Sequence, residues 1–184
     1  MADSPRPPAP AEPRLAVVVV NYDGWPDVLG LAGRLACEPE FLSGACRVAV
    51  VDNASPSPAP DAEVLRSPGL RLVMRPDNGG FAAGVNAGWR ACRAPWLLLL
   101  NPDVDVEPGL LARILARIDA YEARLEGPPG VVGYALRNED GTPQGSVGVF
   151  PGLLRSLREQ FAPRRSRKYV PERRLRAGRA DWVT

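Results

Sequence analysis

Carboxylate and amide side chains directly follow three short apolar runs of this sequence. Their oxygens can accept hydrogen bonds from bases and sugar hydroxyls, and carboxylates are favoured ligands of Mg²⁺ and Mn²⁺. If the apolar runs are neighbouring strands, these polar positions converge and predict one binding site. The positions are Asn21-Tyr22, Asp52-Asn53 and Asn101-Pro102-Asp103.

Asp103 is the first candidate for a metal ligand, because it follows the most apolar run of the chain, residues 96–100. If that run is a fully buried strand, a rigid element holds the carboxylate at the rim where ligands bind. Asp105 lies two residues further on and points the same way if the segment is extended. Two such carboxylates can hold a divalent cation, which neutralises a diphosphate. The residue types leave a second interpretation open, in which Asp103 only caps a helix or turn before Pro108.

Asp52 follows the second apolar run, residues 48–51, and is a candidate for nucleotide contact. Its carboxylate can accept hydrogen bonds from the N–H of a pyrimidine base or from ribose hydroxyls. The same side chain could instead close an Asx-turn over residues 52–55. The two roles are compatible.

A glycine-containing turn, Asn78-Gly79-Gly80-Phe81, leads into a predicted helix. Backbone N–H groups at such a helix start can face a phosphate. A tight strand-to-helix loop explains the same residues without a ligand. The segment is not a P-loop, because no Gly-Lys-Ser/Thr follows, and it lacks the usual spacing of a dinucleotide-binding fingerprint.

Strands that alternate with helices must position these groups. Apolar runs predict strands at residues 15–20, 48–51, 70–74, 96–100 and 131–136. Helical spacing predicts helices that begin at Pro26, Phe81 and Glu107. Gly84 and Gly88 lie on one face of the second helix and would let it approach the sheet closely. This alternation predicts a three-layer α/β/α fold with a mostly parallel sheet and ligands at the carboxyl ends of its strands.

The composition limits which partners, catalytic groups and metal sites can be expected. The 184 residues suit one domain, and a net charge of +2 gives no reason to expect a nucleic-acid partner. The absence of histidine removes the usual general base, so catalysis must depend on carboxylates and on hard cations such as Mg²⁺ or Mn²⁺. Three scattered cysteines argue against a disulfide framework and a zinc site.

The chain divides into three predicted parts. Residues 1–13 form a Pro/Ala-rich leader that we expect to be disordered and that lacks the apolar core of a signal peptide. Residues 14–150 form the core, and residues 151–184 form a basic segment. No run reaches the ~18 apolar residues of a membrane span, so we expect a cytoplasmic protein. The basic stretch Arg155–Arg179 is either a solvated face or a patch for phosphates or anionic lipid, and the latter implies peripheral association with the inner face of the membrane.

Taken together, the motifs resemble those of family 2 glycosyltransferases, in particular a rhamnosyltransferase-like subgroup. The resemblance covers about residues 15–184, and the glycine-rich block is its most specific part. The matching segments are Val19–Tyr22, Val51–Ser55, Asn78–Gly88, Leu99–Asp103, Asp140–Gln144 and Asp181–Val183.

The resemblance implies a GT-A (nucleotide-diphospho-sugar transferase) fold, a dTDP- or UDP-linked sugar donor and a divalent metal. Asn101-Pro102-Asp103 occupies the Asp-x-Asp position of the family, which makes Asp103 the matching metal ligand, whereas Asp105 lies beyond the motif. Asp52 would contact the base, Asn21 and Tyr22 would line the nucleotide pocket, and Asn78 and Asn86 would shape its floor. The residues expected to bind the nucleotide sugar are Asn21, Tyr22, Asp52, Asn53, Asn78, Gly79, Gly80, Asn86 and Asn101.

The implied reaction transfers rhamnose or another hexose, with inversion, to a saccharide or lipid-linked acceptor. Such a transfer needs a general base, which this family carries in a later acidic segment that we expect beyond Thr184. On this interpretation the chain is truncated before its acceptor-binding part and binds donor without activating the acceptor. The alternative is a non-catalytic nucleotide-sugar-binding module or degenerate homologue. A sugar nucleotidyltransferase is disfavoured, because no Gly-rich loop with Arg and Lys follows the first strand.

Overall fold

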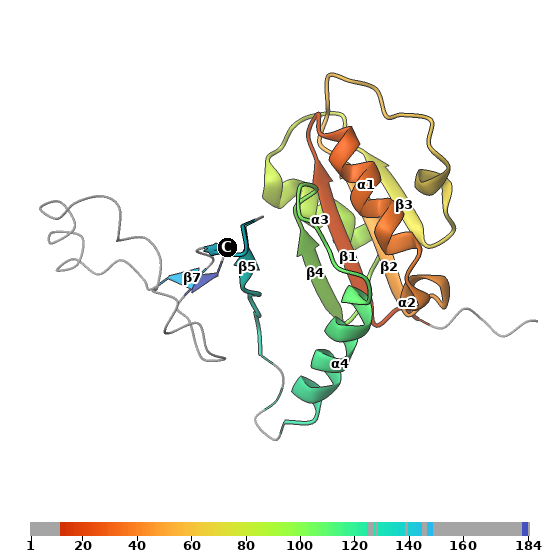
Figure 1. The fold of residues 1–184 in the computed structure, drawn as a ribbon. Coiled ribbons are helices and arrows are strands. Elements are labelled where there is room, and N and C mark those ends of the chain that lie inside the picture. Colours follow the sequence, from red (N-terminus) through yellow and green to blue (C-terminus); the bar gives the residue numbers. More distant parts are fainter. Residues whose placement is uncertain are drawn as a thin grey trace, which may run out of the picture. The chain divides into compact units, whose positions relative to one another are not determined.

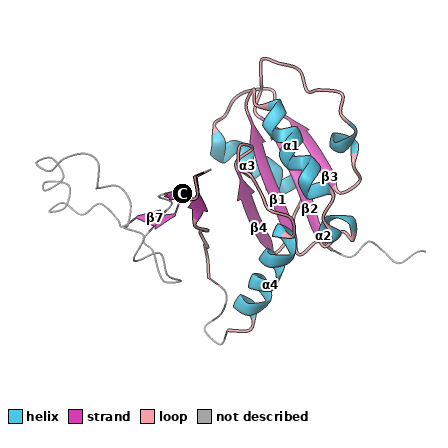
Figure 2. Cartoon of the chain, in the orientation of Figure 1, coloured by secondary structure: helices cyan, strands magenta, loops and turns pink. Residues whose placement is uncertain are grey.

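The chain forms two units in a computed structural model that describes residues 12–124, 127, 129–138, 140–144, 147–148 and 182–183. The first unit is Met1–Arg124 and the second is Leu125–Thr184. Figure 1 follows the elements along the chain, and Figure 2 separates its helices from its strands. Each unit is described by itself.

A four-stranded parallel sheet is the centre of the first unit. Its strands are β1 (Leu15–Asn21), β2 (Cys46–Asp52), β3 (Leu70–Met74) and β4 (Trp96–Leu100), in the order β3-β2-β1-β4. All neighbouring pairs are parallel, with Asn21 opposite Asp52 and Val19 opposite Leu100. The carboxyl ends of the strands therefore meet at one edge, where the arrowheads lie in Figure 1. The predicted α/β fold with a mostly parallel sheet is confirmed.

Helices cover both faces of this sheet (Figure 1). On one face α1 (Trp25–Ala36) and α4 (Leu110–Glu122) pack against alternate residues of β1, from Leu15 to Val19. On the other face α3 (Phe81–Ala91) covers Ala16 and Val18. The short helix α2 (Pro39–Leu42) and the 3₁₀ helix η1 (Glu63–Arg66) complete the unit. None of the helices in the described ranges is long and apolar enough to cross a membrane.

The two glycines of α3 permit close packing, as predicted. A Cβ at Gly84 would lie 2.7 Å from Cγ1 of Val20, and one at Gly88 would lie 2.6 Å from Cγ1 of Val18. Neither position has space for a side chain. The helix therefore rests with its backbone on β1, and its N-terminus begins at the carboxyl edge of the sheet.

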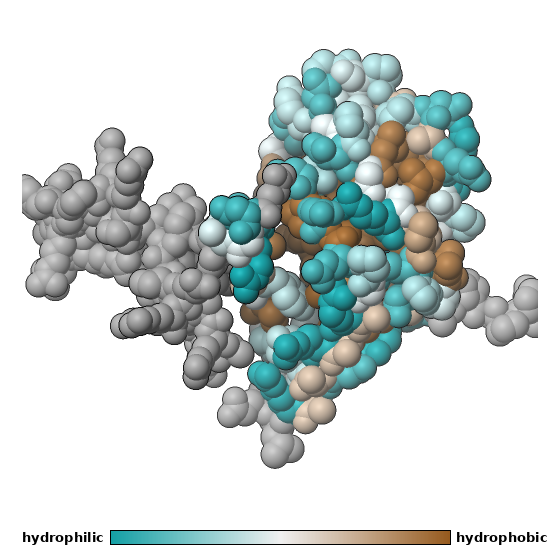
Figure 3. Space-filling model, in the orientation of Figure 1, coloured by the Kyte–Doolittle hydropathy of each residue, from teal (hydrophilic) through white to brown (hydrophobic). Residues whose placement is uncertain are grey.

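The strand at residues 96–100 differs from the prediction of full burial. Leu97 and Leu99 are 39% and 44% exposed. The reason is position: β4 ends the four-stranded sheet of this unit, and α3 packs over β1 and β2. Most of the face in Figure 3 is polar, and apolar groups reach its surface in patches.

The helix predicted from Glu107 begins later, at Leu110. Gly109 precedes it with a φ of 76°, a left-handed conformation that interrupts the helix on its N-terminal side. Val106 is buried in the core instead of lying in a first helical turn. The loop between β4 and α4, which contains Asp103, is therefore longer than predicted.

The second unit contains two short antiparallel pairs within the described residues. One pairs β5 (Leu136–Arg137) with β6 (Pro143–Gln144), and the other pairs β7 (Val147–Gly148) with β8 (Trp182–Val183). The strand predicted at residues 131–136 is wrong except at its last residue, and Val131 is 77% exposed. The turn in which Gly141 N–H donates to the Asn138 carbonyl (2.9 Å) sets the pairing of β5 and β6. The preceding apolar run takes no part in that ladder.

Candidate functional site

Asn21 and Asp52 join the ends of β1 and β2 through their side chains. Both residues are buried, at 0% and 2% exposed. Asn21 Nδ2 donates to Asp52 Oδ1 at 2.8 Å, and Asn21 Oδ1 accepts from the Gly24 N–H at 3.0 Å. Asn21 therefore holds two groups in place: the Asp52 carboxylate at the end of β2, and the loop that leads into α1.

The Asx-turn considered for Asp52 is present. The Ser55 N–H donates to Asp52 Oδ2 at 3.1 Å, and the Ser55 hydroxyl donates to Oδ1. Ser55 Oγ in turn accepts from the Asp23 N–H at 2.7 Å. With the bond from Asn21, the Asp52 carboxylate accepts three hydrogen bonds within the protein. The contact between Asp52 and a nucleotide base stays a prediction. Both carboxylate oxygens already accept a hydrogen bond within the protein, so a base would have to share one of them.

Asn53 and Asn78 connect β2 to the turn before α3. Asn53, 3% exposed, donates from Nδ2 to Asn78 Oδ1 at 2.6 Å. The same oxygen accepts from the Gly80 N–H at 3.1 Å. Gly80 has a φ of 82°, which glycine adopts without strain. The turn therefore holds the start of α3 beside the strand ends, with Asn78, Gly79 and Gly80 exposed to solvent.

Arg75 belongs to this edge, although sequence reasoning did not single it out. It directly follows β3, and its side chain is 19% exposed. A Cβ at Gly79 would lie 2.7 Å from Arg75 Nη2, so the guanidinium lies against the glycine turn. The guanidinium donates to the Ala83 carbonyl at 3.4 Å and to Asp77 Oδ1 at 3.5 Å. Arg75 could have been identified from the sequence by its position directly after a predicted strand, which is also how the other site residues were identified.

The two candidate metal ligands differ in their surroundings. Asp105 forms an ion pair with Arg34 at the end of α1. Asp103 is exposed and has no partner within the described part of the chain. The structure brings no group of three His, Cys, Asp or Glu residues together in the ranges it describes. One free carboxylate fits a cation that takes its other ligands from a diphosphate and water.

Glu38 anchors the loop that carries Asp103 to the rest of the unit. Its buried carboxylate accepts from the N–H groups of Leu110 and Leu111 at 3.1 and 2.7 Å. These are donors of the first turn of α4, which has no side-chain cap of its own. Glu38 therefore supplies the cap from a distant part of the sequence, which sequence reasoning did not identify.

The remaining predicted site residues are exposed. Tyr22, which is 58% exposed, follows β1, and Asn101 follows β4 at the same edge. Asn86 lies further along α3 and is separate from the hydrogen-bonded groups. The structure thus joins Asn21 with Asp52 and Asn53 with Asn78, and leaves the other polar groups open to solvent.

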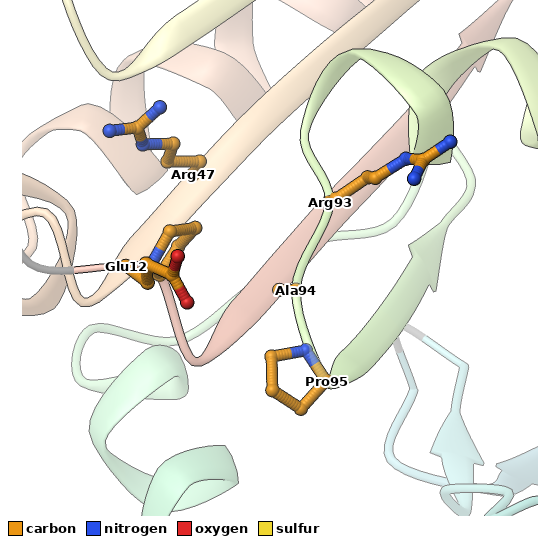
Figure 4. A pocket seen from close by; sticks show the side chains of 6 residues that line it. Glu12, Arg47, Arg93, Ala94 and Pro95 are labelled. Carbon is orange, nitrogen blue, oxygen red and sulfur yellow. The ribbon is translucent and has the colours of Figure 1, made fainter.

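A hollow of the first unit lies elsewhere. It has a volume of about 440 Å³ and lies at the amino ends of the strands, between Glu12, Arg47 and Pro95 (Figure 4). Arg47 and Arg93 point away from each other there, as Figure 4 shows, so their charges do not converge. A smaller hollow of about 200 Å³ lies between α1 and the loop of Asp103. We favour the carboxyl edge as the site, because the buried polar side chains gather there and ligands of open α/β sheets bind there.

Comparison with known families decides the classification. Residues 17–172 match the family described as Glycosyl transferase family 2. The chain belongs to this family. Membership agrees with the resemblance found in the sequence, and the GT-A fold is confirmed by the parallel sheet and by solved structures of similar fold.

A curated relative of this family 2 chain is an N-acetylglucosaminyl-diphospho-decaprenol L-rhamnosyltransferase from Mycobacterium tuberculosis. The two are 28% identical over 152 residues. The match covers 77% of this chain and 47% of the relative, so the chain spans about half the relative's length.

Two solved structures resemble the chain in fold. S. aureus TarS 1–349 in complex with UDP-GlcNAc has a TM-score of 0.51 at 21% identity, over 59% of this chain and 32% of TarS. The mannosyltransferase PcManGT from Pyrobaculum calidifontis, in complex with GDP-Man and Mn²⁺, has a TM-score of 0.52 at 20% identity. That match covers 69% of this chain and 36% of PcManGT.

Proposed function

We propose that this chain binds a nucleoside-diphosphate sugar at the carboxyl edge of its parallel sheet, as the donor-binding part of an inverting glycosyltransferase. The observation that carries the proposal is the set of buried polar side chains that joins the ends of β1 and β2 and the turn before α3. Asn21, Asp52 and Asn53 are each at most 3% exposed, and Asn78 covers Asn53. Convergent polar side chains at the edge of an apolar core support a ligand site there.

In this proposal Asp103 holds a Mg²⁺ or Mn²⁺ ion, which neutralises the donor diphosphate. Its carboxylate has no protein partner among the described residues, whereas the carboxylate of Asp105 is paired with Arg34. Asn21 and Asp52 keep the strand ends in place, and Tyr22 and Asn101 line the open side. Asn86 contributes to the floor of the pocket from α3.

The relatives support the proposed classes of donor and acceptor. UDP-GlcNAc and GDP-Man with Mn²⁺ are bound in structures of similar fold, which supports a nucleotide sugar and a divalent ion. The name of the mycobacterial relative supports transfer of rhamnose to a lipid-linked saccharide. We propose a dTDP- or UDP-linked deoxyhexose or hexose as donor and a saccharide or lipid-linked acceptor.

A lipid-linked acceptor lies at a membrane, and the basic stretch Arg155–Arg179 would attract anionic lipid at the inner face. Co-sedimentation with vesicles tests this part of the proposal. We expect more protein in the pellet with anionic than with neutral vesicles, and less at high salt. Sedimentation that does not depend on anionic lipid would remove the membrane from the proposal.

Calorimetry tests donor binding. UDP and dTDP are titrated into the 184-residue chain with Mn²⁺ and, separately, with EDTA. We expect saturable binding that weakens at least tenfold when the cation is removed. Asp103→Asn should abolish this dependence, and Asp105→Asn, the matched control two residues away, should preserve it. Absence of binding by either nucleotide under any condition would overturn the proposal.

A further inference from the structure

Arginines without ion-pair partners gather on the face of the first unit that α3 covers. Residues 78–102, which contain α3 and β4, include no Asp or Glu. Glu12 lines a hollow together with two of these arginines but forms no ion pair with either. The arginines of this face that have no ion pair within the described ranges are Arg47, Arg71, Arg90 and Arg93.

The register of the sheet places two of these arginines. Arg47 lies opposite Ala16, which packs on the α3 side of the sheet. Arg71 lies opposite Ala49, which packs on the same side. Burial raises the pKa of Cys92 at the end of α3, and the nearby charges of Arg71 and Arg47 oppose this rise. Both guanidinium groups therefore lie near the end of α3, where Arg90 and Arg93 also lie.

The same face leaves apolar side chains exposed. Leu97 and Leu99 alternate with residues of β4 that pack in the core shared with α1 and α4, so both leucines point to the α3 side. They are 39% and 44% exposed, because α3 packs over β1 and β2. Trp89 of α3 is 40% exposed, and the guanidinium of Arg93 lies 5.3 Å from the centroid of its ring.

Helical spacing places Trp89 on the flank of α3 that faces β4. Ala83 faces β3, because it lies against Arg75, which directly follows that strand. Val85, two residues further on, is about 200° away around the helix and lies on the opposite flank. Phe81 and Trp89 lie one turn before and one turn after Val85. In the order β3-β2-β1-β4, this flank faces the strand with the exposed leucines.

We propose that the α3 face of the first unit docks on an anionic membrane surface, with Trp89 among the lipid headgroups and the arginines on lipid phosphates. A bilayer offers both anionic groups and an apolar interior, whereas a nucleic acid or an acidic protein surface would match the charges alone. Trp is favoured at membrane–water interfaces. Arg47 and Arg93 point away from each other (Figure 4), which fits many headgroups spread over a surface better than one bound anion.

The orientation follows from the distribution of charge. The ion-paired carboxylates Asp119 and Glu122 belong to α4, which packs on the other face of the sheet. An anionic surface attracts the face with unpaired arginines and not the face with these carboxylates. The inference extends the membrane part of the proposed function from Arg155–Arg179 to the first unit. It does not depend on donor binding, which calorimetry measures separately.

Fluorescence quenching by brominated lipids tests the contact of Trp89 with the bilayer. The full chain is mixed with vesicles of equal parts phosphatidylglycerol and phosphatidylcholine, with and without bromine on the acyl chains near the headgroups. We expect quenching that is mostly lost in Trp89→Phe, which keeps an aromatic ring, and that is absent with phosphatidylcholine alone. Co-sedimentation without quenching of Trp89 would overturn the inference and leave Arg155–Arg179 as the membrane-binding part. Absence of co-sedimentation would overturn both.

Paired variants test the arginines. Arg90→Gln/Arg93→Gln should weaken partitioning onto the anionic vesicles by about tenfold, because two cations near the lipid phosphates are lost. Arg113→Gln/Arg117→Gln is the matched control, because it removes the same charge from exposed positions of α4. Equal losses in the two folded variants, with folding verified by chemical denaturation, would show that binding follows net charge and would overturn the inference.

Sedimentation velocity without lipid tests the other occupant of this face, a second copy of the chain. We expect a monomer at the concentrations used with vesicles. A dimer that dissociates in Trp89→Ala would show that the α3 face binds another copy, and it would overturn the inference.

Discussion

At the scale of single residues, Gly88 shows how packing decides what a position tolerates. A Cβ at this position would lie 2.6 Å from Cγ1 of Val18 and 3.0 Å from Cγ2 of Val51. We expect Gly88→Ala to lower the free energy of unfolding by about 1–3 kcal/mol, because overpacking outweighs the gain of about 1 kcal/mol in helix propensity. Urea denaturation monitored by circular dichroism measures the change.

Gly33→Ala is the matched control for this prediction. Gly33 lies inside α1, and a Cβ there has no other atom within 4 Å. The free energy of unfolding should rise by about 0.5–1 kcal/mol, since alanine is the better helix former. Similar effects of the two substitutions would contradict the packing argument for Gly88.

Residue types predicted the site better than they predicted its contacts. Asn21, Asp52, Asn53 and Asp103 could be singled out because each follows an apolar run, and parallel strands bring such ends together. Their hydrogen bonds could not be foreseen, because these depend on side-chain directions and loop conformations. The turn from Asp52 to Ser55 was one of two possibilities until the structure was known.

At the scale of elements, the beginning of α4 depends on a carboxylate from another part of the chain. We expect Glu38→Ala to lower the free energy of unfolding by about 1–3 kcal/mol, because two N–H donors of α4, one buried and one partly buried, lose their acceptor. Denaturation in urea measures the loss. Glu63→Ala, at an exposed position in η1, should change the value by less than about 0.5 kcal/mol. Equal losses in the two variants would argue against a capping role for Glu38.

The reactivity of the three cysteines can test which elements of the core are buried. Burial in β2, with smaller contributions from Glu40 and Glu38, raises the pKa of Cys46 to about 12, and burial also raises the pKa of Cys92. Cys37 is exposed at the end of α1. A raised pKa lowers the fraction of reactive thiolate at a given pH. At pH 8 we expect fast reaction of one thiol with a disulfide reagent in the native chain, and of all three in denaturant.

Substitution identifies that thiol. Cys37→Ser should remove the fast phase, and the remaining two thiols should react only as the protein opens. A fast phase that persists in Cys37→Ser would show that β2 or the end of α3 is accessible in the native state.

Sequence patterns predicted four strands of the sheet because each is a short, mainly apolar run, rich in Val or Leu. Sequence patterns failed where the neighbouring elements decide whether a strand is buried or paired. Leu97 and Leu99 are as apolar as residues of β1, but β4 ends the sheet of the first unit and α3 leaves it partly uncovered. The run at residues 131–136 has strand composition without a ladder partner for residues 131–135 in the described part of the chain. Burial and pairing are properties of the assembled sheet.

At the scale of the whole molecule, the candidate donor site lies within one unit. Every predicted site residue, from Asn21 to Asp105, belongs to the unit Met1–Arg124. A ligand bound there stabilises the elements that contact it. The gain in free energy of unfolding depends on the ratio of the ligand concentration to Kd. At a ligand concentration of about 100 times Kd, the stabilisation is about 2.7 kcal/mol.

Hydrogen exchange can locate this stabilisation along the chain. With saturating UDP and Mn²⁺, amide exchange should slow by up to about 100-fold where opening requires ligand release. We expect this in residues 21–24, 52–55 and 78–81, and in the Asp103 loop, and no change in β5 and β6. In Asp103→Asn, adding Mn²⁺ should give no further protection beyond that given by UDP alone. Slower exchange in β5 or β6 would instead mean that the second unit contributes to donor binding, and uniform protection of both units would contradict a site confined to the first.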